Sequence, residues 1–422
     1  MPQIPLTRTE TLRDLTSLSS LRPLRQRVHQ TDAQTLAEQL ALVRIPAPSF
    51  GEQARGEHVL ARFRAIGLGG VRVDEVGNVL GEWAPAGAKG PPVVVAAHLD
   101  TVFPAGADVE PLRRGKRIHA PGITDNCRGL AGMLAVARVV ADAAVRGKHP
   151  VLFAATVGEE GIGDLRGVKH LFREGGGLRD AAACVALDGS GMRRIVHRAI
   201  GSRRLRIAAE GPGGHSWSDR GAPNPVLALA AAAAGIGAMP LPHPERSSLT
   251  VARIGGGSSI NSIPAEAWME LDMRSEATGA LAPMEEGVRA VLDRAAEAEN
   301  AARRAGTPPL RTRVQVIGDR PSGETGADHP LVRAAAAITA SLGAHAELVG
   351  SSTDANVPMA LGVPAIVLGS GGQTGGFHTT GEWIDLDGAW RGAQRSLLTT
   401  LALVGVENVS NPLLPQRAPR SR

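Results

Sequence analysis

Residues 93–100 read VVVAAHLD, a short apolar run that ends directly in a histidine and an aspartate. Three more apolar, β-rich runs lie further along the chain, at 151–157, 181–187 and 365–368. Helical patterns alternate with these runs, at about 31–45, 52–66 and 128–146. Short, continuously apolar strands between helices are typical of an α/β domain whose mostly parallel central sheet is covered on both faces.

Each predicted strand leads to side chains that can bind a metal or act in catalysis. They are His98 and Asp100 after the first run, Glu159 and Glu160 after the second, Asp188 after the third and, beyond a glycine-rich loop, His378 after the fourth. Asp125 lies in a turn, PGITDNCRG, just before a predicted helix. Because ligands of open α/β sheets bind beyond the carboxyl ends of the strands, we expect these groups to converge in one crevice.

Taken singly, each of these side chains also has a structural interpretation. A lone histidine near a strand end is more often hydrogen-bonded than metal-bound, and Asp125 could simply cap the helix that follows it. Taken together, carboxylates gathered in one crevice would repel one another unless cations are present. Histidines and carboxylates in this combination suit divalent ions such as zinc, cobalt or manganese. We therefore expect a metal centre.

A different pattern occupies residues 200–317. Strands and helices follow one another in the order βαββαβ, over 204–210, 225–238, 249–254, 265–273, 284–305 and 311–317. That order is typical of a ferredoxin-like split βαβ sandwich with one open sheet face. The simplest organisation is a domain of residues 197–317 inserted into a catalytic domain of residues 1–196 and 318–422, with two linker strands as a hinge.

The distribution of charge argues against a nucleic-acid partner. The 422 residues carry a net charge of +5, but residues 1–30 contribute +3 of it and residues 411–422 another +3, which leaves −1 for residues 31–410. Terminal tails are usually solvated rather than part of a binding face. Aromatic residues make up only 3% of the chain, so few could stack on bases.

The sequence predicts a cytoplasmic protein without a membrane partner. Two cysteines are too few for a disulfide framework and fit a reducing compartment. The N-terminal stretch MPQIPLTRTETLRDL lacks the continuous apolar core of a signal peptide. The longest uncharged stretch, residues 222–244, contains five prolines, and its helical middle is too short to cross a bilayer.

Eight short motifs stand in the order that they have in a known family. They are AHLDTV (97–102), TDNCRG (124–129), VGEEGIGD (157–164), ALDGS (186–190), GGH (213–215), NSIP (261–264), ELDMR (270–274) and FHTTGEW (377–383). From about residue 35 to 405, the chain resembles the dinuclear-zinc family that includes glutamate carboxypeptidase, acetylornithine deacetylase, succinyl-diaminopimelate desuccinylase, aminoacylase and peptidase T. Asp188, where some deacylases have Glu, and SSTDANVP (351–358) favour the peptidase-T-like branch.

This resemblance implies two divalent metal ions, zinc first, with cobalt or manganese as alternatives. The ligands it implies are His98 and Asp188 for one ion, Glu160 and His378 for the other, and Asp125 as the bridge between them. Asp100 would orient the His98 ring from behind. The resemblance also implies a cis peptide bond between Asp125 and Asn126.

The mechanism that the resemblance implies is attack on an amide carbonyl by a hydroxide that bridges the two ions. Glu159 would be the general base, which takes a proton from the nucleophile and returns it to the leaving amine. On the inserted domain, His215 would stabilise the oxyanion, and Asn261 and Arg274 would hold the substrate. Arg274 could instead pair with Asp272 on its own strand.

The predicted function is that of a dinuclear metallopeptidase that cleaves the amide bond of small peptides, as a di- or tripeptidase or a carboxypeptidase-like enzyme. Deacylation of N-acyl amino acids, as by acetylornithine deacetylase or succinyl-diaminopimelate desuccinylase, is the alternative with the same metal centre. A non-catalytic binding protein on the same fold is less favoured, because the full set of catalytic side chains is present. The resemblance further implies a homodimer formed through the inserted domain, which would also serve as a lid.

Overall fold

The structure is a computed structural model that describes residues 21–143, 145–407 and 409–414. This part of the chain forms two compact units. Unit 1 comprises the residues up to Ala199 and from Glu324 onward, and unit 2 comprises Ile200–Gly323. Each unit has its own hydrophobic core and is described separately below.

Two sequence-based expectations concern the charged tails and a membrane partner. The basic segments, residues 1–30 and 411–422, lie mostly outside the described residues, so their role stays a prediction. Within the described ranges, no helix combines the length and the apolar character that a membrane crossing requires.

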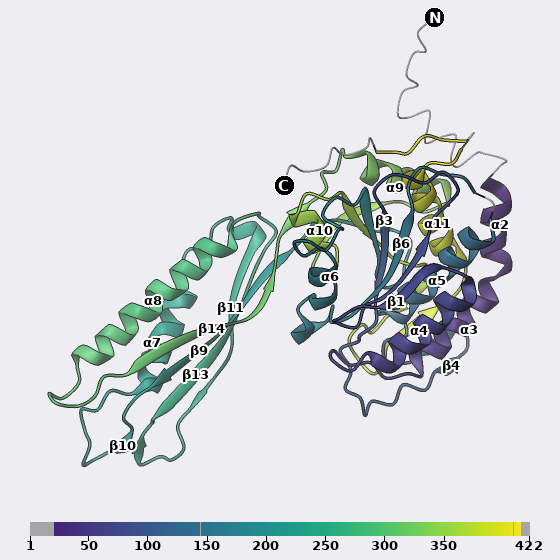
Figure 1. Cartoon of the computed structure of the whole chain (residues 1–422). Helices are drawn as coiled ribbons and strands as arrows, with labels where there is room; N and C mark the ends of the chain where they lie inside the picture. The colour runs from purple at the N-terminus through teal and green to yellow at the C-terminus, as the bar shows by residue number, and fades with distance from the viewer. Residues whose placement is uncertain (1–20, 144, 408, 415–422) are drawn as a thin grey trace, which may run out of the picture. The chain divides into compact units, whose positions relative to one another are not determined.

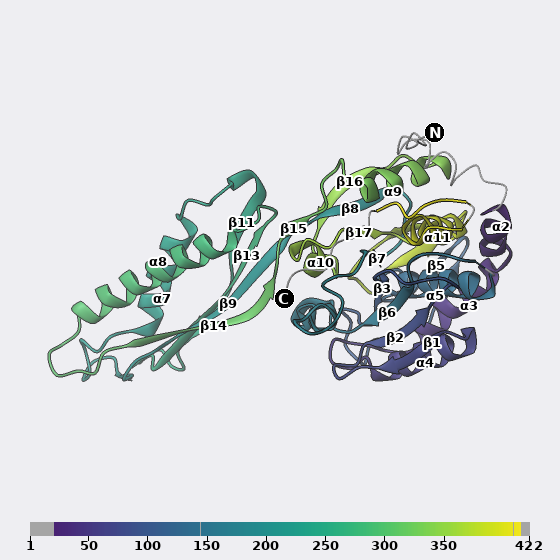
Figure 2. The same ribbon diagram turned by 45° about the horizontal axis from the view of Figure 1, so that its top comes forward.

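Unit 1 is built on one large sheet with the strand order β1-β2-β6-β3-β7-β17-β8-β15, and β16 pairs with β8 (Figures 1 and 2). Its strands are β1 (Gly69–Val73), β2 (Val79–Trp83), β3 (Val93–His98), β6 (Val151–Thr156), β7 (Ala183–Leu187), β8 (Arg194–Ala199), β15 (Gly323–Glu324), β16 (Glu347–Ser351) and β17 (Ala365–Leu368). The central strands β6, β3, β7 and β17 are parallel, whereas β1, β2 and β8 pair antiparallel with their neighbours β2, β6 and β17. The prediction of an α/β domain with a mostly parallel central sheet is confirmed.

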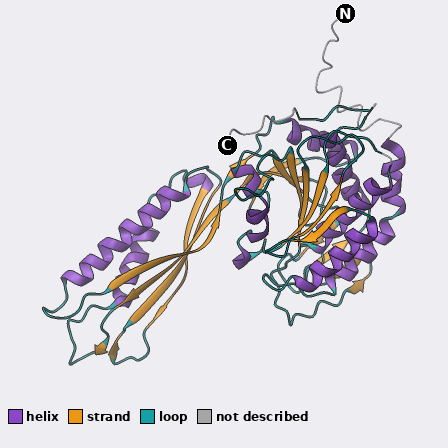
Figure 3. Ribbon diagram, in the orientation of Figure 1, coloured by secondary structure: helices purple, strands orange, loops and turns teal. Residues whose placement is uncertain are grey.

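Helices cover both faces of this sheet, as Figure 3 shows. They are α2 (Arg22–Gln30), α3 (Asp32–Val43), α4 (Gln53–Ile66), α5 (Cys127–Asp142), α6 (Arg166–Leu171), α9 (Pro330–Ser341), α10 (Asn356–Ala360) and α11 (Trp390–Val404). Side chains of β3 alternate between two cores: Val93 and Val95 pack with α4, α5 and α11, whereas Val94 packs with α6 and α10. Burial on both faces explains why these strands are continuously apolar.

Unit 2 is a four-stranded antiparallel sheet of order β11-β13-β9-β14 with two helices on one face. Its elements are β9 (Gly201–Glu210), β10 (Gly214–His215), α7 (Pro225–Gly237), β11 (Ser247–Gly256), β12 (Ser262–Ile263), β13 (Glu266–Ser275), α8 (Leu281–Ala301) and β14 (Arg311–Arg320). Leu205, Ile207 and Met269 face the helices, and Arg206 on the open face donates to Glu270 at 2.6 Å. The predicted split βαβ order is present.

Two small sheets were not predicted from the sequence. In unit 2, β10 and β12 form a two-stranded ladder. In unit 1, a second antiparallel sheet has the order β18-β19-β5-β4, with β4 (Leu112–Arg114), β5 (Arg117–His119), β18 (Gln373–Gly375) and β19 (Trp383–Asp385). Strands of two or three residues carry too little hydrophobic periodicity to be recognised without their partners.

A close backbone approach inside unit 1 gives a stability prediction. A Cβ atom on Gly392, near the start of α11, would overlap backbone atoms of Ser370 and Gly371. Gly392→Ala should therefore destabilise unit 1 by about 1–3 kcal/mol or more, because backbone atoms cannot move aside as a side-chain tip can. Thermal unfolding followed by circular dichroism measures this effect.

The matched control for this variant is Gly56→Ala in α4. There the new methyl group would make ordinary contacts with Val79 and Leu99, and the loss of helix-interior glycine should stabilise by about 0.5–1 kcal/mol. Equal melting temperatures for the two variants would contradict the close approach.

Candidate metal centre

Strand ends bring the candidate ligands together on unit 1. His98 is the last residue of β3 and lies opposite Thr156, the last residue of β6. Asp188 follows β7, and its amide donates to the Leu368 carbonyl at the end of β17. Since β3, β6, β7 and β17 are parallel, their carboxyl ends share one edge of the sheet, as expected for a ligand site.

Asp125 does not cap the helix that follows it. The capping residue of α5 is Asn126, whose side chain accepts from the Gly129 amide at 3.1 Å and donates to the Leu187 carbonyl at 2.9 Å. The capping alternative for Asp125 is therefore wrong, and its carboxylate is left to face the histidines. The peptide bond between Asp125 and Asn126 is cis.

The Asp125 carboxylate lies between two imidazoles. Its Oδ1 is 3.1 Å from Nε2 of His98, and its Oδ2 is 3.1 Å from Nε2 of His378. Asp188 Oδ1 lies 3.7 Å from the same His98 nitrogen, and Glu160 Oε1 lies 3.4 Å from the same His378 nitrogen. Two sets of donor atoms thus share one aspartate.

The chemistry of this donor set fits metal ions. Nε2 of His98 and Oδ1 of Asp125 are buried and have no hydrogen-bond partner. Nδ1 of His98 lies 3.0 Å from the Asp100 carbonyl oxygen, to which it can donate, so in the neutral ring Nε2 carries the lone pair that a metal would bind. Ligand atoms of His98, Asp125 and Glu160 all lie within 4.8 Å of one another. Buried nitrogen and oxygen donors of this kind suit zinc and similar divalent ions.

Without a metal, the electrostatics of the site depend on protonated histidines. Hydrogen bonds to Asp125 and Glu160 raise the pKa of His378 to about 10. Burial opposes a charge on His98, but its contacts with Asp100, Asp125 and Asp188 leave the pKa of that ring well above its usual value. Burial likewise acts to raise the pKa of Asp125, and the two histidines outweigh it, so that this carboxyl ionises readily.

Asp100 holds the loop that carries Glu159 and Glu160. Its Oδ1 accepts from the Glu159 amide at 2.9 Å, and its Oδ2 accepts from the Glu160 amide at 3.0 Å and from the Ser49 hydroxyl at 2.7 Å. The contact of its carboxylate with Nδ1 of His98 is longer, at 3.5 Å. Asp100 therefore reaches both a candidate ligand and the candidate general base.

Glu382 holds the loop that carries Asp125 in a similar way, and the sequence did not reveal this. Its fully buried carboxylate accepts from the amides of Gly122 at 2.8 Å, Thr124 at 2.8 Å and Asp125 at 3.1 Å, and from the Thr124 hydroxyl. Burial raises the pKa of Glu382 against these hydrogen bonds. The residue belongs to the motif FHTTGEW, but its partners are about 260 positions away in the chain.

Asp354 is a second buried carboxylate that we did not single out as a site residue. Its Oδ2 accepts from the Thr156 hydroxyl at 2.5 Å, whereas its Oδ1 has no hydrogen-bond partner. Burial raises its pKa to about 6, and the negative charges of Asp100 and Asp188 add to this effect. The motif SSTDANVP, which contains Asp354, was the only signal in the sequence.

The other predicted side chains lie on unit 2. His215 pairs with Ser262 in the β10–β12 ladder, and the Ser216 amide donates to the Asn261 carbonyl at 3.0 Å, so His215 and Asn261 are neighbours. Nδ1 of His215 accepts from the Trp217 amide at 3.2 Å and from the Ser218 amide at 3.4 Å.

Arg274 forms the ion pair that the sequence offered as its structural alternative. Its Nε donates to Asp272 Oδ2 at 2.7 Å on the same strand, β13. The guanidinium stays partly exposed, so this contact alone does not define its role.

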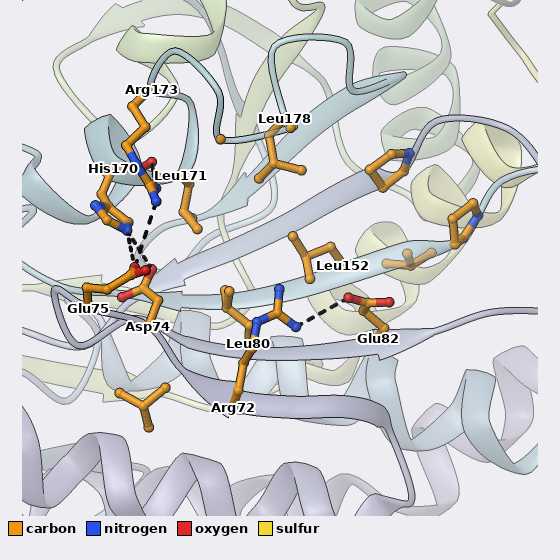
Figure 4. Close-up of a pocket in the computed structure, with 16 residues that line it drawn as sticks. Arg72, Asp74, Glu75, Leu80, Glu82, Leu152, His170, Leu171, Arg173 and Leu178 are labelled. Atoms are coloured by element: carbon orange, nitrogen blue, oxygen red, sulfur yellow. Dashed lines mark hydrogen bonds and ion pairs between the residues drawn. The ribbon is translucent and has the colours of Figure 1, made fainter.

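A separate hollow of about 720 Å³ on unit 1 involves none of the candidate ligands (Figure 4). Leu80, Leu152, Leu171 and Leu178 form its apolar part, and charged side chains stand around them. Those side chains contact one another: Arg72 pairs with Glu82 at 3.4 Å, and Nε2 of His170 lies 2.7 Å from Oε2 of Glu75. Asp74, Glu75 and His170 are close enough for a metal, but Asp74 Oδ1 already accepts three backbone amides.

Comparison with known proteins gives one family and a consistent fold. The model of peptidase family M20/M25/M40 matches residues 94–400. Among solved structures, the chain is similar to aminopeptidase PepT from Bacillus cereus, with 21% sequence identity and a TM-score of 0.70 over 87% of this chain and 97% of that one. It is similar to a tripeptidase from Staphylococcus aureus, with 21% identity and a TM-score of 0.69 over 89% of this chain and 97% of that one. It is also similar to the YxeP protein of Bacillus subtilis, a dinuclear metal-binding peptidase, with 17% identity and a TM-score of 0.65 over 88% of this chain and 98% of that one. None of the curated proteins matches the chain.

Glu382 gives a prediction for metal binding. In Glu382→Gln, an amide NH₂ group replaces one of the acceptor oxygens and faces backbone amides, so the loop with Asp125 should lose its position. We expect metal affinity to fall about 10- to 100-fold, as for other residues that support ligands from behind. Competition with a chelator measures the change. Glu110→Gln, which removes only an exposed partner of Arg44, is the control, and equal affinities for the two variants would contradict this function of Glu382.

The raised pKa of His378 gives a second prediction. Because the ring is protonated at neutral pH in the metal-free protein, it must release a proton before it can bind a metal. Apparent metal affinity should therefore rise with pH, by about tenfold per pH unit for the proton that His378 loses, up to pH near 10. Calorimetry in buffers of different ionisation enthalpy counts the protons, and metal binding at pH 7 without proton release would contradict the assignment.

Proposed function

This chain belongs to peptidase family M20/M25/M40, as the resemblance of its motifs predicted, and we propose that it hydrolyses the amide bond of small peptides with the help of two metal ions. The observation that carries the proposal is the position of Asp125, whose two carboxylate oxygens each lie 3.1 Å from a different histidine. A carboxylate shared in this way between two donor sets is suited to bridge two cations.

The proposed ligands form two sets, and the distances between their atoms support this division. They are His98 and Asp188 for one ion, Glu160 and His378 for the other, and Asp125 for both. We propose zinc, and cobalt or manganese would suit the same nitrogen and oxygen donors. When bound, such ions polarise an amide carbonyl and make water acidic enough to react at neutral pH.

Glu159 is the proposed general base. It is buried directly beside Glu160, and the two backbone amides are held by different oxygens of Asp100. The Glu160 carboxylate faces His378, which leaves Glu159 as the neighbouring carboxylate able to take a proton from the attacking water. It then returns that proton to the leaving amine nitrogen.

Three side chains of unit 2 complete the proposal. Because Nδ1 of His215 accepts two backbone amides, the neutral ring carries its proton on Nε2, which is the donor that an oxyanion requires. Asn261 lies next to it. Arg274 has an exposed guanidinium that could bind a substrate carboxylate in exchange for its contact with Asp272.

Deacylation of N-acyl amino acids would use the same side chains and is the alternative activity. Assays of the metal-loaded protein against a panel of di- and tripeptides and a panel of N-acyl amino acids separate the two functions. Homodimerisation through unit 2 is part of the same proposal, and sedimentation measures it.

Replacement of Glu159 tests the proposed mechanism. Glu159→Gln keeps the size of the side chain but removes the base, so turnover should fall by at least about 100-fold. Metal content should stay near two ions per chain, because Glu159 is not a proposed ligand. Elemental analysis and initial rates on the best substrate are the measurements. Near-normal activity in a variant with full metal content would exclude Glu159 as the base.

A further inference from the structure

Three large, exposed apolar side chains lie close in sequence to residues of the candidate metal centre or to a residue that supports it. Phe377 directly precedes His378, and Phe50 follows Ser49, whose hydroxyl donates to Asp100. Ile162 lies on the short 3₁₀ turn that follows Glu160. All three are open to solvent, and Phe50 is 63% exposed.

Phe377 lies between two candidate ligands. Its ring is 3.7 Å from the position that a Cβ atom on Gly189 would occupy, and Gly189 follows Asp188. His378, the next residue, reaches Asp125 and Glu160. The ring therefore lies beside residues of both donor sets, while 44% of Phe377 remains accessible.

Phe50 is held by Arg166, near the loop that carries Glu159. The Arg166 guanidinium carbon lies 5.0 Å from the centre of the Phe50 ring, and Arg166 is fixed by Glu52 at 2.8 Å. The Arg166 side chain also packs against Gly158, which directly precedes Glu159. One face of the ring thus has a rigid support.

The backbone near these side chains is constrained. Phe50 has a φ of 71° and His378 a φ of 58°, in the left-handed region that residues other than glycine rarely adopt. Such conformations persist only where the surrounding structure enforces them, and they concentrate at functional sites. An ordinary surface phenylalanine would not require this arrangement.

In unit 2, too, exposed apolar side chains lie next to predicted site residues. Trp217, which donates its amide to His215, is 75% exposed, and Ile260 precedes Asn261 and is fully exposed. Single exposed apolar residues are common on protein surfaces. Here, however, Phe377 directly precedes His378, Trp217 donates its amide to His215, and Phe50 follows Ser49, which donates to Asp100.

We propose that the substrates of this enzyme are peptides with large apolar side chains next to the scissile bond, and that Phe377 and Phe50 are the residues of unit 1 that select them. This inference rests on the proposed peptidase function and adds the class of substrate. Aliphatic and aromatic side chains would bury the two exposed rings on binding, whereas glycine would leave them in water and a charged side chain would lose hydration against them.

The test compares kcat/KM of the zinc-loaded protein for Leu-Leu, Gly-Gly and Asp-Asp. The wild type should prefer Leu-Leu over both other dipeptides by at least about tenfold, the selectivity typical of apolar pockets. Phe377→Ala and Phe50→Ala should each lower the ratio of Leu-Leu to Gly-Gly rates several-fold, by up to about tenfold, toward equal rates. Phe377→Leu should largely restore the ratio, because the leucine side chain is also apolar.

Leu227→Ala is the control, because the exposure of Leu227, 57%, lies between those of Phe377 and Phe50, and Leu227 lies on α7, away in sequence from every predicted site residue. An equal change of the ratio in this control would overturn the inference, and so would equal wild-type rates on the three dipeptides. Either result leaves the proposed peptidase function intact. If the zinc-loaded wild type cleaves none of these three dipeptides but cleaves other peptides of the di- and tripeptide panel, only this inference fails. If it cleaves no peptide of the panel, the proposed function fails as well. Metal content, measured for each variant, separates loss of selectivity from loss of zinc.

Discussion

The Asp125 carboxylate, placed between two imidazoles, is the contact on which the rest of the catalytic unit depends. Its two oxygens lie 3.1 Å from His98 and from His378, residues that are 280 positions apart in the chain. Several carboxylates share this small buried volume, and negative charges in such a place require cations close by. The protonated histidines supply positive charge in the metal-free protein, and divalent ions would supply more.

Other buried polar side chains keep this arrangement in place by holding backbone amides. Asp100 accepts from the amides of Glu159 and Glu160, and Glu382 accepts from three amides around Asp125. Asn126 caps α5 and so leaves Asp125 free to face the histidines. In each case, a short loop after a strand or before a helix is fixed by one side chain with several hydrogen bonds, and buried networks of this kind are rigid when fully satisfied.

Much of the fold could be predicted because its signals are local. The continuous apolar runs that became β3, β6, β7 and β17 showed a buried parallel sheet, and the alternation over 204–210 and 265–273 showed a half-exposed antiparallel one. Most candidate ligands were found for the same reason, since His98, Glu160, Asp188 and His378 each come after a recognisable strand, whereas Asp125 was found in the turn before a helix. Glu382 and Asp354 were not identified, because a buried carboxylate in a loop has the same local pattern as a solvated one.

The sequence by itself determined the α/β class, the βαββαβ order of unit 2, the family and the residues that could bind metal, since periodicity and motif order are properties of neighbours along the chain. Only the tertiary structure decided that Asn126 rather than Asp125 caps the helix, that Glu382 accepts from the amides around Asp125, and that Phe377 lies beside Gly189. Those relations join residues from separate loops. Their geometry is set by packing of the strands that carry them, and no local pattern records it.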